Sequence, residues 1–476
     1  MPPAPTRAAA APAASADARP RSRSLPLVAL AAMTGLHGLC SAMVAAVLPA
    51  LQTQFPGAPT GTWVTGAFFL AAALAAPVGG RLADLLGARR VALGGLALIV
   101  VASLGAAVAS SATWLVAARA VTGIGTAVQY PAALGLLRRS ATTVPATTGL
   151  AVIALASEVA FASGPSLGAV LMTWGGWPTA LAAPALLAAL ATGLVVVGTE
   201  RHPGRWPGWR RLLAAVDVPG LAVFCALVMV VLAWLLALPQ EIRWTLVAVL
   251  PVLLGLLWVW EREFAPVAFL PTSVVAHRIL MLTLARSVLF FCCFYAIFYS
   301  LPSWLTAHGL TTGQIALVML PLPALVGATC LLARRLVNRG DARTALLLGA
   351  GGLVLVAALA GALSGATLWI AVAIAAALAV PAGLVNVANQ SLLYHTAPAS
   401  RTSAIGGIYR TAQFIGGGVA AAVIQMADPA TGMQDLALLA GAGALVLMLS
   451  CLLDRTDQHR PTAVVVVSAQ RTGPPS

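Results

Sequence analysis

The chain has 476 residues, of which 60% are hydrophobic and only 8% are charged. An average soluble domain carries about 25% charged residues, so this composition excludes a soluble globular protein and indicates a polytopic membrane protein. The formal net charge is +14, but the arginines lie in short clusters between apolar runs. Because that distribution is typical of loops at a membrane surface, we expect a lipid bilayer as the partner and no nucleic acid.

Residues 1–24 are rich in Ala, Pro, Ser and Arg and are predicted to form a disordered tail, as is the polar segment 454–476. Between these tails, long apolar runs alternate with short connections. The runs are close to or above the ~20 residues that cross a bilayer as a helix, so we predict about fourteen spans. The predicted spans are residues 25–51, 62–80, 91–109, 113–137, 147–172, 178–198, 217–238, 243–260, 279–304, 314–333, 343–363, 367–391, 403–426 and 434–453.

The arginines distinguish the two sides of the predicted membrane. Alternate connections, such as 81–90, 201–211 and 334–343, hold nearly all of them, whereas the opposite connections hold almost only Arg243. Since basic residues are enriched in cytoplasmic loops, both termini are predicted to lie in the cytoplasm. All basic residues are Arg and the chain is rich in Ala, which indicates a high-GC bacterial genome. We therefore expect a multi-pass protein of a bacterial inner membrane.

The connection after the second span, at residues 80–90, reads G-R-L-A-D-L-L-G-A-R-R. A solvated positive loop would need only the arginines, so the additional order indicates a further role for this loop. Its glycine and charged positions include Gly80, Asp84, Gly87, Arg89 and Arg90. Gly87 has no Cβ to strain a tight turn, and Asp84 can accept hydrogen bonds from nearby amides or pair with an arginine or a neighbouring helix end. The pattern resembles the loop signature of major facilitator superfamily transporters, which implies an all-α polytopic fold and a gating role for this loop on the cytoplasmic side.

A weaker copy of this turn lies at residues 335–343, with Asn338 in place of the aspartate. It follows the tenth span, so the tenth span corresponds to the second. Together with the resemblance, this repeat implies two six-helix bundles with two inserted central helices. The two bundles are expected to rock around a site that they share. The predicted domains are a tail at 1–24, an N-terminal bundle at 25–200, two linker helices with their loops at 201–278, a C-terminal bundle at 279–453 and a tail at 454–476.

The fifth predicted span contains Gly164, Pro165 and Gly168, which predict a kink and a close approach of another helix. Helix packing alone would also explain these residues. Their spacing resembles a helix-five motif of exporters in the same superfamily, with Ala169 in place of the last glycine. Over nearly the whole chain, the organisation resembles the fourteen-span drug:proton antiporter branch. One departure is Cys40, which stands where that branch usually has an acidic residue.

Ionisable residues inside a span are costly, so they are expected to face a cavity or a partner. Glu158 is the one carboxylate predicted near the middle of a span. Burial favours the neutral form of a carboxyl group and a nearby arginine favours its charged form, so Glu158 can load and release a proton. The alternative is a structural glutamate bound by Arg119 or another buried donor. The predicted proton-coupling residues are Glu158, Arg119 and His37.

Polar and aromatic side chains in the C-terminal half predict a substrate cavity. The ninth span is rich in aromatic residues, which would line a cavity or face lipid. Three arginines within spans against one glutamate favour a neutral or anionic substrate, unless their long side chains reach the membrane interface. The predicted cavity residues are Arg286, Arg410, Gln413, Asn386, Asn389, Gln390, Phe294 and Tyr295.

These features indicate a secondary transporter, and proton-coupled efflux of a small organic molecule such as a drug, an antibiotic or a secondary metabolite is the main hypothesis. An uptake symporter or a uniporter is the alternative, because the acid in the first span is missing. The sequence has no H-E-x-x-H motif and no G-x-x-x-x-G-K-[ST] loop, so neither an enzyme nor a nucleotide-driven pump is expected. We expect a proton gradient as the energy source, no cofactor or metal, and a functional monomer.

Overall fold

The computed structural model describes residues 24–56, 60–139, 146–200, 208, 210, 217–237, 244–265, 278–362, 368–396, 402–427 and 432–453. Apart from Ser24, the two predicted tails lie outside these residues. In the described part of the chain all regular secondary structure is helical, as the composition predicted. The helices are α1 Ser24–Ala42, α2 Val44–Gln54, α3 Thr60–Leu82, η1 Ala83–Gly87, α4 Ala88–Ala107, α5 Ala112–Ala127, α6 Gln129–Arg139, α7 Ala146–Gly198, α9 Val218–Ala237, α10 Trp244–Val259, η2 Trp260–Phe264, α12 Arg278–Ala307, α13 Thr312–Met319, α14 Leu322–Asn338, α15 Ala342–Gly361, α16 Leu368–Ala377, α17 Ala379–Thr396, α18 Thr402–Met426 and α19 Met433–Leu453.

The predicted spans all fall on these helices or on consecutive pairs of them. By length and composition alone, the described residues contain ten stretches that could cross a membrane. Two of the ten, Thr60–Ala107 and Thr148–Gly198, are 48 and 51 residues long, and each holds two of the predicted spans. The chain is therefore a multi-pass helical protein, while the number of crossings stays a prediction.

Polar residues in the short connections start several helices by accepting hydrogen bonds from free backbone N–H groups. The Ser111 side chain accepts from the Trp114 amide at the start of α5. Thr311 and Gln314 form a reciprocal capping box at α13, and Asp341 accepts from the Thr344 amide at α15. Such caps contribute about 1 kcal/mol each, and they mark where an apolar run leaves the membrane and the next one enters.

The long helix α7 consists of two arms joined by a non-helical pair, Gly175 and Gly176. Gly176 has a φ of 69°, in the left-handed region that favours glycine. The break separates the predicted fifth and sixth spans. The backbone keeps helical φ and ψ at Gly164, Pro165 and Gly168, and the non-helical break of α7 lies about ten residues later, so a kink at these three residues stays a prediction.

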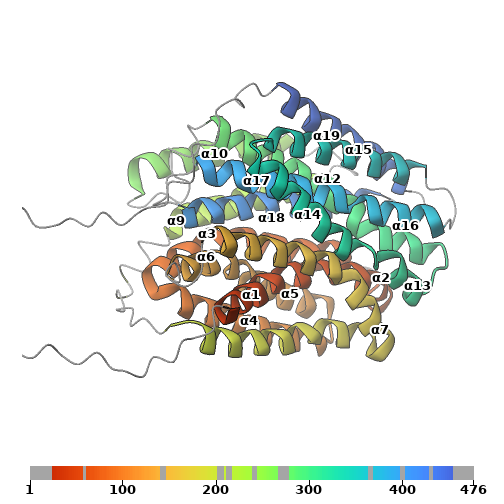
Figure 1. The fold of residues 1–476 in the computed structure, drawn as a ribbon, viewed down its shortest axis with the longest axis horizontal. Helices are drawn as coiled ribbons and strands as arrows, with labels where there is room; N and C mark the ends of the chain where they lie inside the picture. Colours follow the sequence, from red (N-terminus) through yellow and green to blue (C-terminus); the bar gives the residue numbers. More distant parts are fainter. Residues whose placement is uncertain are drawn as a thin grey trace, which may run out of the picture.

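Two groups of helices form the body of the protein (Figure 1). In the N-terminal group, coloured red to yellow, α1 and α4 pack on α7, and α3 and α4 pack on α5. In the C-terminal group, coloured green to blue, α12 packs on α18 and α19, α15 packs on α17 and α19, and α14 packs on α17. The groups meet where α3 lies on α18 and where α7 lies on α13 and α14. This pairing is the two-bundle architecture that the repeat implied.

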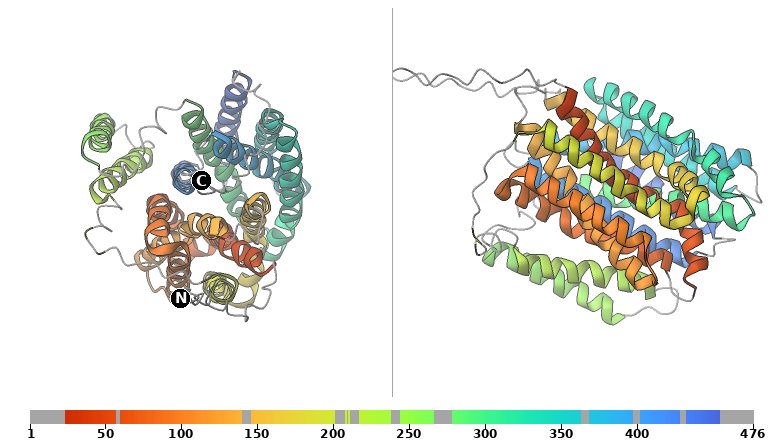
Figure 2. Two further views of the ribbon diagram at one scale, coloured as in Figure 1. Left: turned by 60° about the vertical axis from the view of Figure 1, so that its left-hand side comes forward. Right: turned by 90° about the horizontal axis from the view of Figure 1, so that it is seen from below.

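The two inserted helices, central in the sequence, are peripheral in space. Figure 2 shows α9 and α10 on the outside of the two bundles. They pack on each other, and α9 also touches α3 and α18. Phe224, Val228 and Leu257 form their small apolar contact with Leu74 and the rest of this face of α3. The position of α9 across the α3–α18 contact places the pair beside the seam between the halves without inserting it there.

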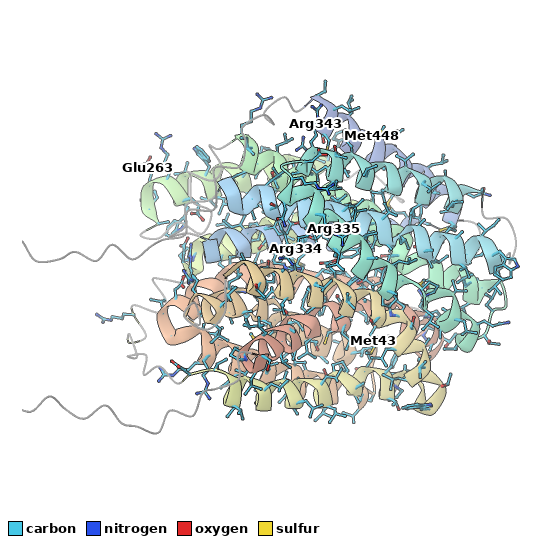
Figure 3. The ribbon with its side chains drawn as sticks, in the orientation of Figure 1. Met43, Glu263, Arg334, Arg335, Arg343 and Met448 are labelled. Carbon is cyan, nitrogen blue, oxygen red and sulfur yellow. The ribbon has the colours of Figure 1, made fainter. Side chains whose placement is uncertain are left out.

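The internal repeat extends to the contacts of its arginines. Arg89, at the start of α4, donates to the carbonyl oxygen of Val196 near the end of α7 at 2.9 Å. Arg343, at the start of α15, donates to the carbonyl oxygens of Cys451 and Leu452 at the end of α19, at 3.2 and 2.7 Å. Figure 3 shows Arg343 beside α19, near Met448 on that helix. In both halves an arginine therefore binds the free carbonyls of the half's last helix.

Candidate functional site

A small central cavity lies between the two halves, with walls from α1, α7, α12, α17 and α18. Its volume is about 10 Å³, which is room for a single water molecule. Five of its twelve lining residues are Phe or Tyr, and polar side chains lie between them. The residues that line it are His37, Gly38, Ser157, Glu158, Phe161, Phe290, Phe291, Phe294, Tyr295, Ala382, Arg410 and Gln413.

Glu158, on α7, is bound from the other half of the molecule. Its Oε1 accepts a hydrogen bond from Nδ2 of Asn386 on α17. Both residues are buried, with 8% and 1% of their surface exposed. A buried carboxyl group needs such a partner, because its desolvation is otherwise uncompensated. The structure therefore places the one acidic side chain of this cavity at the seam between the halves.

Asn386 connects Glu158 to a network within the C-terminal half. Its Oδ1 accepts from the Tyr409 hydroxyl at 2.8 Å, from Gln390 Nε2 at 3.0 Å and from Gln413 Nε2 at 3.1 Å. An oxygen that accepts three bonds fixes the amide orientation, so that Nδ2 points to Glu158. Glu158 is thus connected by hydrogen bonds to α17 through Asn386, and to α18 through Tyr409 and Gln413.

Arg410, on α18, is the second charged group of the cavity and is buried. Its Nη1 donates to Gln413 at 2.8 Å, and Nη2 donates to the Ser157 hydroxyl of the other half at 3.4 Å. The guanidinium lies over the Tyr130 ring, 4.1 Å from its centroid. Ring contact and hydrogen bonds hold a buried arginine in one orientation. Arg410 is therefore part of the cavity wall and does not extend to the membrane interface.

His37, on α1, also lines the cavity, where its ring packs between Phe68 and Phe414 at centroid distances of 5.9 and 4.9 Å. Among the described residues, its Nδ1 has no hydrogen-bond partner. His37 thus lies at the same site as Glu158 and Arg410, although the sequence assigned Glu158 and His37 to proton coupling and Arg410 to the substrate cavity.

Arg119 does not belong to this cavity. Its Nη1 donates to the carbonyl oxygen of Cys40 at 3.0 Å, and its guanidinium lies 4.5 Å from the centroid of the Phe68 ring. It lines a separate small cavity together with Cys40 and Thr122. Arg119 is therefore not the partner of Glu158. Asn386 is the other buried donor that the alternative of a structural glutamate allowed, so that alternative stays open. Arg119 instead satisfies a backbone carbonyl in α1, next to the break between α1 and α2.

Two of the predicted cavity residues point elsewhere. Arg286 donates to the hydroxyl and carbonyl oxygens of Ser450 on α19, and it does not line the central cavity. Asn389 donates to the Ser287 hydroxyl on α12 at 3.4 Å. Both lie at helix contacts inside the C-terminal bundle. The sequence placed them on the correct helices but could not give the direction in which each side chain points.

The remaining predictions for the cavity fit its geometry. Phe294 and Tyr295 line it and are buried, so the aromatic face of α12 does not face lipid there. Gln413 lines it, and Gln390 lies one hydrogen bond away through Asn386. Four neighbours that the sequence did not mark complete the site: Ser157, Phe161, Tyr130 and Tyr409. Ser157 and Tyr409 directly adjoin Glu158 and Arg410 in the chain, whereas Phe161 and Tyr130 lie within apolar runs that do not mark them as site residues.

The turn at residues 80–90 lies at one end of the bundles. Gly87 has a φ of 95°, which explains the need for glycine, and η1 carries Asp84. Asp84 pairs with Arg138 at the end of α6, with 2.8 Å between Oδ1 and Nη2. Asp84 thus binds a neighbouring helix end, which was one of the partners that the sequence predicted. The turn connects α3, α4 and α6 at this end of the protein.

Two hydrogen bonds cross the seam beside the central cavity. The Tyr130 hydroxyl of α6 donates to Gln390 of α17 at 3.2 Å. The Thr411 hydroxyl of α18 donates to the Ala73 carbonyl of α3 at 3.0 Å. Both bonds join the halves next to Arg410, which lines the cavity.

The sequence of the chain is similar to those of known membrane transporters. The family model of the Major Facilitator Superfamily covers residues 30–421. The MFS-type transporter YwoD of Bacillus subtilis is 28% identical over 410 residues, which are 83% of this chain and 88% of that protein. The tetracenomycin C resistance and export protein of Streptomyces glaucescens is 27% identical over 441 residues, 85% of this chain and 76% of that protein.

Among solved structures, the human organic anion transporter MFSD10 (TETRAN) shares the fold. Its TM-score is 0.60 at 18% identity, with 90% of this chain and 99% of that chain covered. The family model spans most of the sequence, from α1 to α18, and the two bundles meet around a central cavity. The chain is therefore a multi-pass membrane transporter that belongs to the Major Facilitator Superfamily.

Proposed function

We propose that this transporter exports a small organic molecule in exchange for protons by alternating access. The observation that carries the proposal is the bond between Glu158 and Asn386. Glu158 is the acidic side chain among the described residues of the central cavity, and its partner comes from the opposite half. A group in this position changes partners when the halves move, so its protonation and the opening of the cavity are linked. The export function of the Streptomyces glaucescens relative supports the direction.

The exchange follows from the two environments of Glu158. In the closed seam the carboxyl group is desolvated, which favours its protonated form, while Asn386 and the nearby Arg410 favour the charged form. When the seam opens at the turn of residues 80–90, water reaches Glu158, and the proton leaves to the cytoplasm. Substrate then enters from the cytoplasm, and the halves rock to expose it to the other side. There Glu158 takes up a proton, which returns the protein to its starting state.

We place the protein in the bacterial inner membrane as a monomer, with both termini and the turn of residues 80–90 in the cytoplasm. The distribution of arginines supports this orientation, because basic loops stay on the cytoplasmic side. The proton gradient is the energy source, and no cofactor or metal takes part. The described His, Cys, Asp and Glu side chains form no group that could hold a metal ion, which is compatible with this proposal.

Export is tested in cells that lack their own drug pumps and are loaded with fluorescent compounds of different charge. Expression should lower the retained dye, and an uncoupler should restore it. Lower retention that survives the uncoupler would reject proton coupling and favour a uniporter. Higher dye uptake that the uncoupler abolishes would favour an uptake symporter. This is the alternative function suggested by Cys40 in place of the usual acidic residue.

Glu158→Gln tests the role of the carboxyl group directly. Glutamine keeps the size and a hydrogen-bond acceptor for Asn386, but it cannot exchange a proton at this site. In proteoliposomes we expect proton-driven transport to fall by at least about tenfold, while counterflow without a proton gradient persists. A tenfold loss in rate corresponds to about 1.4 kcal/mol in activation free energy. Full proton-driven transport by Glu158→Gln would end the proposal.

A further inference from the structure

A second and larger cavity lies between the halves at the end opposite η1. Its walls come from the end of α2, the start of α3, the ends of α12 and α18 and the start of α19. The volume is about 230 Å³. Small-molecule pockets in proteins have volumes of about 300–1,000 Å³, so this outer cavity is near the lower end of that range. It is large enough for a small ligand, whereas the central cavity has room for a water molecule.

The described lining of the outer cavity carries hydroxyl, amide and indole groups. None of the described residues that line it is Asp, Glu, Arg or His, although ionisable side chains line both smaller cavities. Apolar side chains such as Leu48 and Ile424 form the rest of the wall. The polar side chains of this described lining are Gln52, Thr60, Thr62, Thr65, Tyr299, Ser300, Ser303, Trp304 and Gln425.

Two of these hydroxyls are buried without a partner. Thr65 and Ser300 are 3% and 8% exposed, and neither Oγ atom makes a hydrogen bond within the described residues. Helical hydroxyls commonly bond to a carbonyl one turn back, as Thr34 does with Leu30 at 2.7 Å. Burying a hydroxyl without a hydrogen-bond partner carries a desolvation penalty. A ligand that supplies an acceptor removes this penalty, which makes its binding free energy more favourable. Thr65 is on α3 and Ser300 is on α12, so such a ligand would bridge the halves.

An aromatic layer joins the outer cavity to the central one. Tyr295 lines the central cavity, and Tyr299, one turn further along α12, lines the outer cavity. Phe69 of α3 packs on both rings, at centroid distances of 5.3 and 6.1 Å. The two cavities are therefore consecutive along one face of α12. A charged substrate that crossed this layer would leave Arg410 and Glu158 and meet no counter-charge among the described residues that line the outer cavity.

We propose that the outer cavity is a binding site for an uncharged amphipathic molecule, whose hydrogen-bond acceptors bind the hydroxyls of Thr65 and Ser300. The exit route thereby selects uncharged substrates. This rests on the proposed function in that the outer cavity lies on the exit side of an exporter. The binding site itself does not depend on proton coupling, so its test can be separated from the test of transport.

The first experiment measures which small molecules enter the cavity. Thr65→Cys and Ser300→Cys are purified in detergent and treated with three methanethiosulfonates: an uncharged methyl, a cationic ethylammonium and an anionic ethylsulfonate reagent. After division by each reagent's rate with a free thiol, we expect the uncharged reagent to react at least about tenfold faster than both charged ones, because the cavity does not compensate a charge. The unsubstituted protein gives the background of its six native cysteines.

Ser110→Cys is the control, because Ser110 is exposed between α4 and α5 and outside the cavity. There the three normalised rates should agree. Equal normalised rates for a charged and the uncharged reagent at Thr65→Cys and Ser300→Cys would overturn the proposal. A failure of all three reagents to react at both positions would overturn it as well, since the cavity would then be closed to small molecules.

The second experiment measures binding of an uncharged probe, Nile red, which carries a carbonyl acceptor. Binding to the protein in lipid nanodiscs is followed by dye fluorescence, with empty nanodiscs subtracted. The pair Thr65→Val and Ser300→Ala removes both hydroxyls, and we expect Kd to rise about three- to tenfold per hydroxyl bond lost. The pair Thr65→Ser and Ser300→Thr keeps both hydroxyls and should bind like the unsubstituted protein. Equal Kd values for the two pairs would overturn the role of the hydroxyls.

The two proposals fail in different ways. If the dye binds through the hydroxyls but cells show no uncoupler-sensitive export, the exporter is rejected and the binding site stands. If export is uncoupler-sensitive but a cationic dye is exported as well as Nile red, the exporter stands and the selection of uncharged substrates is rejected.

Discussion

Glu158 and Asn386 are 228 residues apart in the chain, and they meet at the seam between the two halves. Around them the structure satisfies most of the buried polar groups by one connected network, in which Asn386 serves as donor to Glu158 and as acceptor for Tyr409, Gln390 and Gln413. Such a network is worth more than its separate bonds when it is complete, and it is costly when one member is lost. The stability of this region is therefore coupled to the state of Glu158.

A double-mutant cycle tests that coupling at the level of single residues. Asn386→Ala leaves Glu158 and three donors without their partner. We therefore expect the free energy of unfolding in detergent to fall by about 1–3 kcal/mol. In a Glu158→Gln background the same substitution should cost less, because an uncharged amide tolerates the loss of its donor better than a carboxylate does. Additive effects, with a coupling below about 0.5 kcal/mol, would show that the bond does not join the halves energetically.

At the scale of helices, the close contact of α1 with α7 positions the site. A Cβ on Gly38 would lie 2.7 Å from the Phe161 amide nitrogen and would overlap the Ser157 carbonyl. A Cβ on Gly164 would lie 2.7 Å from the Met43 amide nitrogen, next to the break between α1 and α2. Small residues allow membrane helices to approach this closely. The glycines of the fifth-span motif thus act by close packing, which brings Ser157 and Glu158 to the cavity.

Gly38→Ala should destabilise the protein by about 1–3 kcal/mol, because the added methyl group meets the backbone of α7 and cannot be accommodated by a rotamer change. Gly94→Ala is the matched control, since a Cβ on Gly94 of α4 meets nothing within 4 Å. It should be neutral or slightly stabilising because alanine favours the helix. Thermal unfolding in detergent, followed by tryptophan fluorescence, measures both. Equal midpoints for the two variants would contradict the close contact.

The turn at residues 80–90 gives a second prediction at the scale of helices. The Asp84–Arg138 pair is about half exposed, with 54% and 46% of the side chains accessible, so its contribution to folding is small. Its effect should appear in turnover, because the turn of residues 80–90 is predicted to be the gating loop at the end that opens to the cytoplasm. We expect Asp84→Ala to lower the rate of transport more than the amount of protein.

The exchanged pair Asp84→Arg with Arg138→Asp serves as the control for this prediction. It keeps an ion pair between η1 and α6, and it should recover part of the lost transport rate. If Asp84→Ala transports at the normal rate per molecule, the turn does not act as a gating loop.

For the molecule as a whole, hydrogen bonds cross the seam beside the central cavity, and the larger cavity lies at the end opposite η1. The bonds run from Tyr130 to Gln390 and from Thr411 to Ala73. The contact of α3 with α18 and that of α7 with α13 and α14 are the surfaces on which the halves would turn. In the proposed alternating access, the bonds across the seam have to break when the halves rock apart.

Tyr130→Phe should shift this equilibrium of the whole molecule. The substitution removes the hydroxyl that donates to Gln390 and keeps the ring under Arg410. Loss of one such bond shifts an equilibrium by about 0.5–1.5 kcal/mol, so hydrogen exchange at the ends of α6 and α17 should become about two- to tenfold faster. Exchange in α4, away from the seam, is the internal control. Unchanged exchange at α6 and α17 would show that this bond does not hold the closed state.

Several levels of this protein could be predicted from its sequence because they depend on local properties. Apolar runs long enough to cross a bilayer must become helices, since lipid offers no partner for free backbone groups. The turn with Gly87 and its weaker copy at residues 335–343 indicated the family and the two halves. Glu158, Arg410, His37 and Gln413, which the sequence selected, line the central cavity, while their roles stay predictions. A charged or polar side chain in an apolar run has few other places to go.

The tertiary structure decided which of these groups meet. In nearly uniform apolar helices, the sequence does not mark which face turns inward, and a rotation of 100° per residue separates a cavity wall from a helix contact. For that reason Arg286 and Asn389 were expected in the cavity but bind Ser450 and Ser287, and Arg119 binds the Cys40 carbonyl while Asn386 binds Glu158. The uncharged outer cavity is built from the ends of helices far apart in the chain, so it exists only once both halves are packed.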